Sequence, residues 1–376
     1  MKKLTVILIA ALVAISACTK VERDPATTGR KIFFTVGNYA VGTKTGESSL
    51  ALITRRFQSR AFLHAYGVNG TQDFFGAGSG EMVSWDGTDT WAPGTLSGFD
   101  YFWPFDSRSY INFVCWYDRN GAPDTLSLSE TNLEWTDRTI TPSDTILFAD
   151  AAWRYNSNEY HTFDIDAQVG VPVLFHHALG QIAFKGKLKD NSTTGLSDNF
   201  ILSRSGLIRW EVYVKDVVLS NVCSTGSLTL SNIDPGTANT TQPWTASTGN
   251  VWDPDAESAG TLVITDSTDL AVTAVDLLVD ASVMPQAITN DMALTMTYGV
   301  RTYLKEGNSF PNTPHSVEIV HFSRPLRDLV PTITSWPMGT RTIYTIEIDP
   351  ASGSIIFAPT LEDWDPTVGG GTVTLE

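Results

Sequence analysis

The sequence predicts an all-β fold, and three observations support this prediction. Short runs alternate apolar and polar residues with a period of two, as strands do when they bury one face. Turn-forming residues separate the runs, with Asn-Gly or Asp-Gly pairs at 69–70, 86–87 and 120–121. No stretch keeps a helical period through three turns with capping residues at both ends.

The alternating runs occur along the whole chain. In the run 210–220, Trp210, Val212 and Val214 alternate with residues that tolerate water, so we expect one buried and one wet face. In chain order the expected strands are 31–36 (KIFFTV), 61–66 (AFLHAY), 111–117 (INFVCWY), 210–220 (WEVYVKDVVLS), 261–265 (TLVIT), 293–298 (ALTMTY), 342–349 (TIYTIEID) and 354–359 (SIIFAP).

The run VPVLFHHALGQIAFKGKL (171–188) fits either a helix or two strands. Its first half could form an apolar helix face, but Pro172 precedes that face and Gly180 interrupts it. The residues that follow continue with a period of two, which favours strand, bend, strand. Adjacent residues of a strand face opposite sides, so His176 and His177 cannot bind one metal ion together. The sequence therefore predicts structural histidines and no metal site.

Length and one polar stretch predict two domains. The chain has 376 residues, and domains commonly hold ~150 residues. The polar stretch NSNEYHTFDIDAQVG (156–170) separates two β-rich halves. The expected domains are 18–170, whose first strand lies at about 31–36, and 171–376.

The N-terminus predicts export. Lys2 and Lys3 precede an apolar run at 4–15, which is too short to span a bilayer and is typical of a signal peptide. Small residues before Cys18 resemble the lipobox of bacterial lipoproteins. That resemblance implies a signal peptide at 1–17, a lipid on Cys18 and attachment to the outer membrane. An ordinary signal peptide followed by a chance cysteine is the alternative.

Charge argues against a nucleic-acid partner. The formal net charge is −16, and it becomes −18 when the two lysines of the signal peptide are removed. Such a surface repels phosphate backbones.

The remaining cysteines, Cys115 and Cys223, are far apart in sequence and lie within or beside apolar strand patterns. Two buried thiols are favoured over one disulfide.

No catalytic motif is present in the sequence. G-x-S-x-G, H-E-x-x-H, a Walker loop and a Rossmann fingerprint are all missing, so we expect no enzyme, no cofactor and no metal. The acidic pairs Asp164 with Asp166 and Asp255 with Glu257 are interpreted as solvated loops. A glycosidase with two carboxylates distant in sequence stays open.

Eight stretches, taken together, resemble the fimbrillin family of Bacteroidetes, the type V pilins. The histidine that matches the family's F-x-H-A-L-x-x-I-x-F signature is His177. The stretches are 32–45 (IFFTVGNYAVGTKT), 101–117 (YFWPFDSRSYINFVCWY), 144–152 (DTILFADAA), 173–188 (VLFHHALGQIAFKGKL), 217–230 (VVLSNVCSTGSLTL), 282–286 (SVMPQ), 335–348 (SWPMGTRTIYTIEI) and 363–364 (DW). Their number and order carry the resemblance, which covers nearly the whole chain.

The resemblance implies a fold, a location and a mode of assembly. It implies two β-sandwich domains of transthyretin-like topology, in a subunit exported as a lipoprotein to the cell surface. It also implies that a protease cuts after an arginine and removes the first strand. A strand of another subunit then fills the groove and builds a pilus that supports adhesion and biofilm formation. A head-to-tail contact of this kind does not close, so it grows a filament.

Candidate processing sites lie between the first two expected strands. TRRFQSRAF offers Arg55, Arg56 and Arg60, and Arg60 is the first choice because the next strand is expected to begin at Ala61. An unprocessed basic loop is the alternative.

The C-terminus offers a candidate donor strand at 372–376. Val373 and Leu375 alternate with Thr372 and Thr374 after a run of three glycines. The same residues could form the last strand of their own sandwich. In that case the protein resembles a tip, accessory or anchor subunit.

A surface glycan-binding lipoprotein that does not polymerise is the rival function. The chain has 11 tryptophans, and some lie in loops rich in glycine and aspartate. Trp85, Trp91, Trp244 and Trp252 are the candidates for stacking on a sugar of a host glycan, or for contacting a protein receptor. The alternative is that these rings cover the ends of a sandwich.

Overall fold

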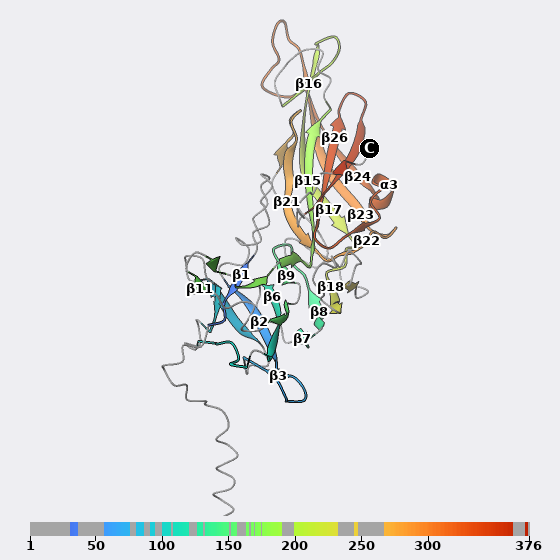
Figure 1. Ribbon diagram of the computed structural model, residues 1–376. Helices are drawn as coiled ribbons and strands as arrows, with labels where there is room; N and C mark the ends of the chain where they lie inside the picture. The colour runs from blue at the N-terminus through green and yellow to red at the C-terminus, as the bar shows by residue number, and fades with distance from the viewer. Residues whose placement is uncertain are drawn as a thin grey trace, which may run out of the picture.

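The structure is a computed structural model in which strands dominate (Figure 1). It describes residues 31–36, 56–75, 80–85, 91–94, 100–106, 108–119, 126–130, 132–149, 152–155, 163–164, 167–168, 170–173, 175–189, 199–231, 244–246, 267–363 and 373–374. Within these ranges the only helix is α3 (Leu326–Leu329). The prediction of a β-rich fold is therefore confirmed.

The largest sheet is built mainly from the first half of the chain. Its order is β13-β1-β5-β4-β2-β6-β9-β14, with β10 paired to β6 and β3 paired to β2. The strands are β1 (Phe34–Val36), β2 (Arg56–His64), β3 (Gln72–Asp73), β4 (Glu81–Trp85), β5 (Trp91–Pro93), β6 (Tyr110–Asp118), β9 (Ile146–Ala149), β10 (Ala152–Tyr155), β13 (Val171–Val173) and β14 (Phe175–His177).

A four-stranded sheet joins the two halves of the chain. Its order is β19 (Trp244–Ala246), β18 (Thr225–Ser231), β8 (Asn132–Thr139) and β7 (Leu126–Leu128). Its inner side chains pack with Phe62, Val114 and Trp116 of the ten-stranded sheet in one buried cluster. Because β8 and β18 come from different halves, this cluster links segments that are distant in sequence.

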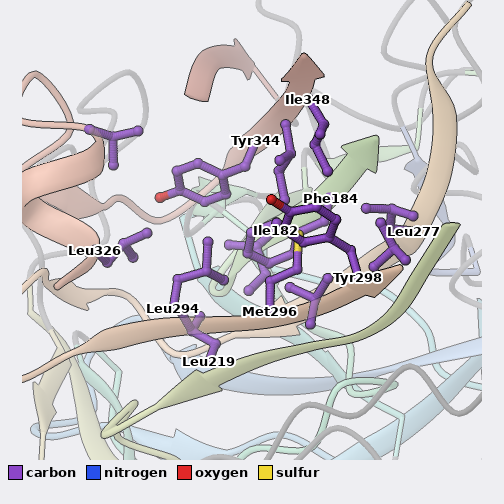
Figure 2. Close-up of a cluster of buried hydrophobic side chains, with 14 of the residues drawn as sticks. Ile182, Phe184, Leu219, Leu277, Leu294, Met296, Tyr298, Leu326, Tyr344 and Ile348 are labelled. Atoms are coloured by element: carbon purple, nitrogen blue, oxygen red, sulfur yellow. The ribbon is translucent and has the colours of Figure 1, made fainter. Parts of the chain in front are cut away.

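Two further sheets pack face to face in the upper part of Figure 1. One runs β21 (Val275–Val283), β15 (Gly180–Leu188), β26 (Thr340–Asp349), β27 (Ser354–Asp363) and β28 (Val373–Thr374). The other runs β16 (Ile201–Leu202), β17 (Ile208–Ser220), β23 (Ala293–Leu304) and β24 (Ser316–Pro325), with β20 (Thr268–Asp269) beside β17. Figure 2 shows the core between them, where Ile182 and Phe184 meet Leu294 and Met296.

Two short ribbons complete the described strands. β11 (Phe163–Asp164) pairs with β12 (Ala167–Gln168), and β22 (Gln286–Ala287) pairs with β25 (Ser335–Trp336). Most ladders are antiparallel, whereas β1 with β13 and β15 with β26 are parallel.

Alternation in sequence explains which faces are buried. In β17, Val212 and Val214 are buried while the residues between and after them are not, as the period of two predicts. The ladder with β23 shifts register between Val214 and Asp216, and the Asp216 carboxylate accepts the Thr297 N–H at 3.0 Å. This bulge reverses the alternation, so Val217 and Leu219 also face the core.

Seven of the eight expected strands fall on observed strands, and the run 261–265 lies outside the described residues. Strand, bend, strand is also confirmed for 171–188, as β13, β14, bends at Ala178 and Leu179, and β15. β14 pairs with β9, so the ten-stranded sheet continues past residue 171 to His177. The division at residue 171 and the transthyretin-like topology stay predictions.

Candidate functional site

The strand β1 lies inside the ten-stranded sheet and carries the candidate site. It pairs with β13 on one side and with β5 on the other, through Phe34 and Trp91. Phe34 is fully buried, and its ring meets the rings of Phe57 at 5.6 Å and Phe113 at 5.3 Å in edge-to-face geometry. Ile32 is also buried in this cluster. The N-terminal strand is therefore a core element and not a peripheral arm.

Hydrogen bonds fix β1 along both of its edges. The Ile32 N–H donates to the Tyr101 carbonyl at 2.8 Å, and the Val171 N–H donates to the Phe33 carbonyl at 2.9 Å. The Gly170 N–H donates to Thr35 Oγ1 at 3.1 Å. A Cβ on Gly170 would lie 2.8 Å from the Phe34 carbonyl carbon, so only glycine allows this close approach.

A phenol and a carboxylate stand beside β1. Tyr101 Oη donates to Glu81 Oε2 at 2.8 Å. Burial, and then the neighbouring Glu81, raises the pKa of Tyr101 to about 12. The phenol is therefore neutral at physiological pH and acts as a donor that holds the loop under β1.

The structure corrects the reason for choosing Arg60 as the processing site. β2 begins at Arg56 and not at Ala61, because Phe57, Ser59 and Ala61 already alternate inward. Arg60 lies within the strand, where its side chain bonds Asp73 at 3.1 Å and the Leu128 carbonyl at 3.0 Å.

The two candidate arginines that the structure describes therefore differ in access. Arg56 is exposed at the first position of β2, and Arg55 lies outside the described residues. Arg60, whose side chain is held by two hydrogen bonds within the sheet, is therefore less accessible than Arg56.

The tail contributes one short ladder. Val373 pairs with Leu361 and Thr374 pairs with Thr360, so β28 lies antiparallel to β27 of its own chain. Thr372, Leu375 and Cys18 lie outside the described residues.

Of the four candidate tryptophans, the structure describes Trp85, Trp91 and Trp244, and none of these three is exposed. Trp91 and Trp244 expose only 6% and 7% of their areas, so neither offers a ring face to a sugar. Trp85 is partly buried against the same cluster as Phe34, and Trp252 lies outside the described residues. For Trp91 and Trp244 the structure thus favours the alternative in which the rings cover a core, because both lie in strands that face one.

Trp244 supplies a testable contact in the cluster that joins the two halves. Its Nε1–H donates to the Ala178 carbonyl at 2.6 Å, and both groups are buried. We expect Trp244→Phe to lower the free energy of unfolding by about 1–3 kcal/mol beyond the loss of ring area, because the carbonyl is left unsatisfied. Urea unfolding measures this, with Trp91→Phe as the same change in another buried strand. Equal losses of unfolding free energy in both variants would contradict a stabilising role for the hydrogen bond from Trp244 to the Ala178 carbonyl.

Exposed aromatic residues occur where the sequence reasoning did not place them. Phe105 is 96% exposed, and Tyr66 is 58% exposed with the Arg108 guanidinium 3.5 Å from its ring centre. The Tyr66 N–H donates to Ser109 Oγ at 3.0 Å, which holds the two loops together. A hydrophobic residue followed by turn residues, as in Pro-Phe-Asp-Ser, was the available signal in the sequence.

Histidine and cysteine side chains serve packing. His177 is buried, whereas the His176 ring lies 5.5 Å from the Phe148 ring at an interplanar angle of 37°. Cys115 and Cys223 are thiols and not disulfide partners. Burial raises the pKa of Cys115 to about 12, so it stays protonated, and its Sγ lies 3.3 Å from Ser59 Oγ.

Metal-binding clusters and membrane-spanning helices are absent from the described part of the chain. The part of the chain that the structure describes holds no group of three or more histidine, cysteine or acidic side chains fit for a metal ion. Across the same residues, no helix is long and apolar enough to span a membrane.

These sheets and this core define a mostly β protein with a single short helix in its described part. The chain belongs to the fimbrillin-like family, whose model matches residues 65–364. This is a family of fimbrial proteins with structural and adhesive rather than catalytic roles.

A solved structure of a fimbrial protein shows a similar fold. A fimbrial protein from Bacteroides vulgatus matches with a TM-score of 0.54 and 16% identity, covering 89% of this chain and 99% of that one. A candidate cell adhesion protein from Bacteroides uniformis covers 91% of this chain and 100% of its own, at 17% identity and a TM-score of 0.45. No curated protein matches.

Proposed function

We propose that the chain is a structural or adhesive subunit of a type V fimbria, assembled by proteolysis and strand exchange. The observation that carries this proposal is the position of β1 between β13 and β5, with Phe34 fully buried. Loss of β1 would leave two unpaired strand edges and an apolar slot. An extended segment of another subunit satisfies both, through backbone hydrogen bonds and inserted side chains.

The segments around β1 suit this role. The link between β1 and β2 spans residues 37–55 and ends next to the exposed Arg56, so one cut there separates β1 from the rest of the sheet. In the proposal the donor is 372–376 of another copy. In the described residues the ladder of β28 on β27 has two residue pairs, so the release of this part breaks few bonds.

The proposed site of action is the cell surface. A lipid on Cys18 holds the precursor at the outer membrane. Cleavage after Arg55 or Arg56 frees the subunit from the N-terminal fragment, which keeps both the lipid and β1. The assembled fimbria supports adhesion to a host glycan or protein receptor and biofilm formation.

Limited proteolysis tests this proposal on the chain of residues 19–376. We expect an arginine-specific protease at low dose to cut at Arg55 or Arg56 before it cuts at Arg60. The cut chain should then form a ladder of oligomers on a native gel, with the new N-terminus identified by mass spectrometry. A labelled peptide of residues 369–376 should bind the cut chain and not the intact one.

Two variants sharpen this experiment. Arg60→Gln should leave the cleavage unchanged, whereas Arg55→Gln combined with Arg56→Gln should abolish both cleavage and oligomers. If the chain is cut at Arg56 and stays monomeric, assembly by strand exchange is wrong.

A glycan-binding lipoprotein that does not polymerise is the second candidate. The exposed Phe105 and the Tyr66 ring stacked on Arg108 favour it, because exposed rings bind the apolar faces of sugars. Glycan-array binding that is lost in Phe105→Ala, by a chain that stays monomeric after cleavage, would support this candidate.

A further inference from the structure

The strand β24 (Ser316–Pro325) ends its sheet with an open edge. It pairs with β23 over ten residues without a register shift, from Ser316 opposite Thr302 to Pro325 opposite Ala293. Among the described strands none pairs with its other side. An edge of this length presents a row of backbone donors and acceptors to any strand that approaches it.

The edge is also accessible and apolar. The four residues from Ser316 to Ile319 are all exposed, so both faces of this half of the strand contact solvent. Val317 and Ile319 are 51% and 47% exposed. Protective features of natural edges are scarce here, since β24 has no lysine and no bulge, and its proline is the last residue.

The charges of β24 favour pairing with a second copy of the same strand in one antiparallel register. Two copies of β24 that pair antiparallel about His321 place Glu318 of each copy opposite Arg324 of the other, because both residues lie three positions from His321. Registers centred on Glu318 or Arg324 would place like charges opposite each other. Opposite-charge pairs across strands stabilise a sheet, and like charges directly opposite destabilise it.

The apolar residues fit the same register. Val320 of one copy lies opposite Phe322 of the other, and this contact occurs twice about the two-fold axis. Both side chains are half-buried and pack on the core of their own sandwich, where Phe322 stacks on Phe357 at 5.7 Å. Aromatic residues and β-branched residues are favourable partners across antiparallel strands.

We propose that two copies of this chain associate through their β24 edges, in an antiparallel pair centred on His321, to form one continuous sheet across the dimer. The contact is isologous and closes on itself, so it makes a dimer and not a fibre. It uses β24, which belongs to a different sheet from β1, and it needs no cleavage. It therefore stands or fails separately from strand exchange.

Sedimentation velocity on the intact chain of residues 19–376 tests the dimer. A contact of one strand pair is small, so we expect a dissociation constant in the micromolar range. Glu318→Arg or Arg324→Glu alone should weaken self-association at least ~10-fold, because each variant creates like-charge pairs twice in the dimer. An equimolar mixture of the two variants should dimerise again, since the reversed charges then face each other.

The mixture also excludes misfolding as the cause of a loss, because only folded chains with complementary edges can associate. Arg204→Glu makes the same charge change in an exposed turn of the same sheet and should leave the dimer intact. A chain that stays monomeric at ~200 μM would overturn the proposal. A dimer that both single reversals leave unchanged would also overturn it, because another surface must then form the contact.

Discussion

Phe34→Ala is expected to lower the free energy of unfolding of the intact chain by about 3–5 kcal/mol. The Phe34 side chain has no exposed area and makes edge-to-face contacts with the Phe57 and Phe113 rings. Its removal therefore leaves a cavity and loses both contacts. Stabilities of single domains are typically about 5–15 kcal/mol, so this loss is a large part of the total. Urea unfolding followed by tryptophan emission measures it.

Phe105→Ala is the matched control, because it removes the same atoms from a side chain that is 96% exposed. We expect a change within about 0.5 kcal/mol for this variant. Equal stability of the two variants would show that β1 does not contribute to the core, and the slot on which strand exchange depends would then not exist.

The effect at Phe34 also bears on how assembly is triggered. A strand that contributes several kilocalories per mole seldom leaves its sheet, so in the proposed assembly the intact chain would be protected from early exchange. In the proposed assembly, cleavage would remove the covalent attachment of β1, and a donor strand would then compete with β1 as a separate segment.

The alternation of apolar and polar residues predicted the strands well, because a strand that buries one face has an apolar residue at every second position. The run 210–220 and the run 342–349 both lie inside observed strands whose buried positions follow that pattern. Pairing order was not predictable in this way. The parallel contact of β1 with β13 joins residues that are more than a hundred positions apart, and nothing local specifies it.

The candidate site was predictable in kind but not in detail. A first strand followed by arginines is visible in the sequence, but the start of β2 at Arg56 depends on the partners of Phe57 and Ser59 across the sheet. Trp91 and Trp244 illustrate the same limit. Their neighbours in sequence are polar, yet both rings are buried by strands that arrive from elsewhere in the chain.

His177 is expected to make the protein less stable in acid. Burial, with a smaller contribution from His176, lowers the pKa of His177 from 6.5 to about 3. The folded state therefore binds this proton more weakly than the unfolded state does. The contribution of neutral His177 is fully present above pH 6.5 and is lost as the pH falls from 6.5 toward 3.

The size of this effect follows from the shift. Each pH unit below the unfolded pKa costs about 1.4 kcal/mol, so at about pH 4.5 the loss is about 2–3 kcal/mol relative to neutral pH. The measurement is the free energy of unfolding in urea at about pH 4.5 and at neutral pH. Carboxylates titrate in the same range, so the informative quantity is the difference between the protein and a variant without this imidazole.

His177→Leu keeps a side chain of similar volume in β14 and removes the titrating group. The variant should lose less stability between neutral pH and about pH 4.5 than the unmodified protein does, by about 2–3 kcal/mol. His315→Leu, at an exposed position of the β23–β24 connection, should retain the pH dependence of the unmodified protein. Parallel pH profiles for His177→Leu and the unmodified protein would mean that the imidazole accepts its proton as easily in the folded state as in the unfolded one. Burial between β9 and the bend at Ala178 makes that outcome unfavourable, because a charged ring there would lose its hydration.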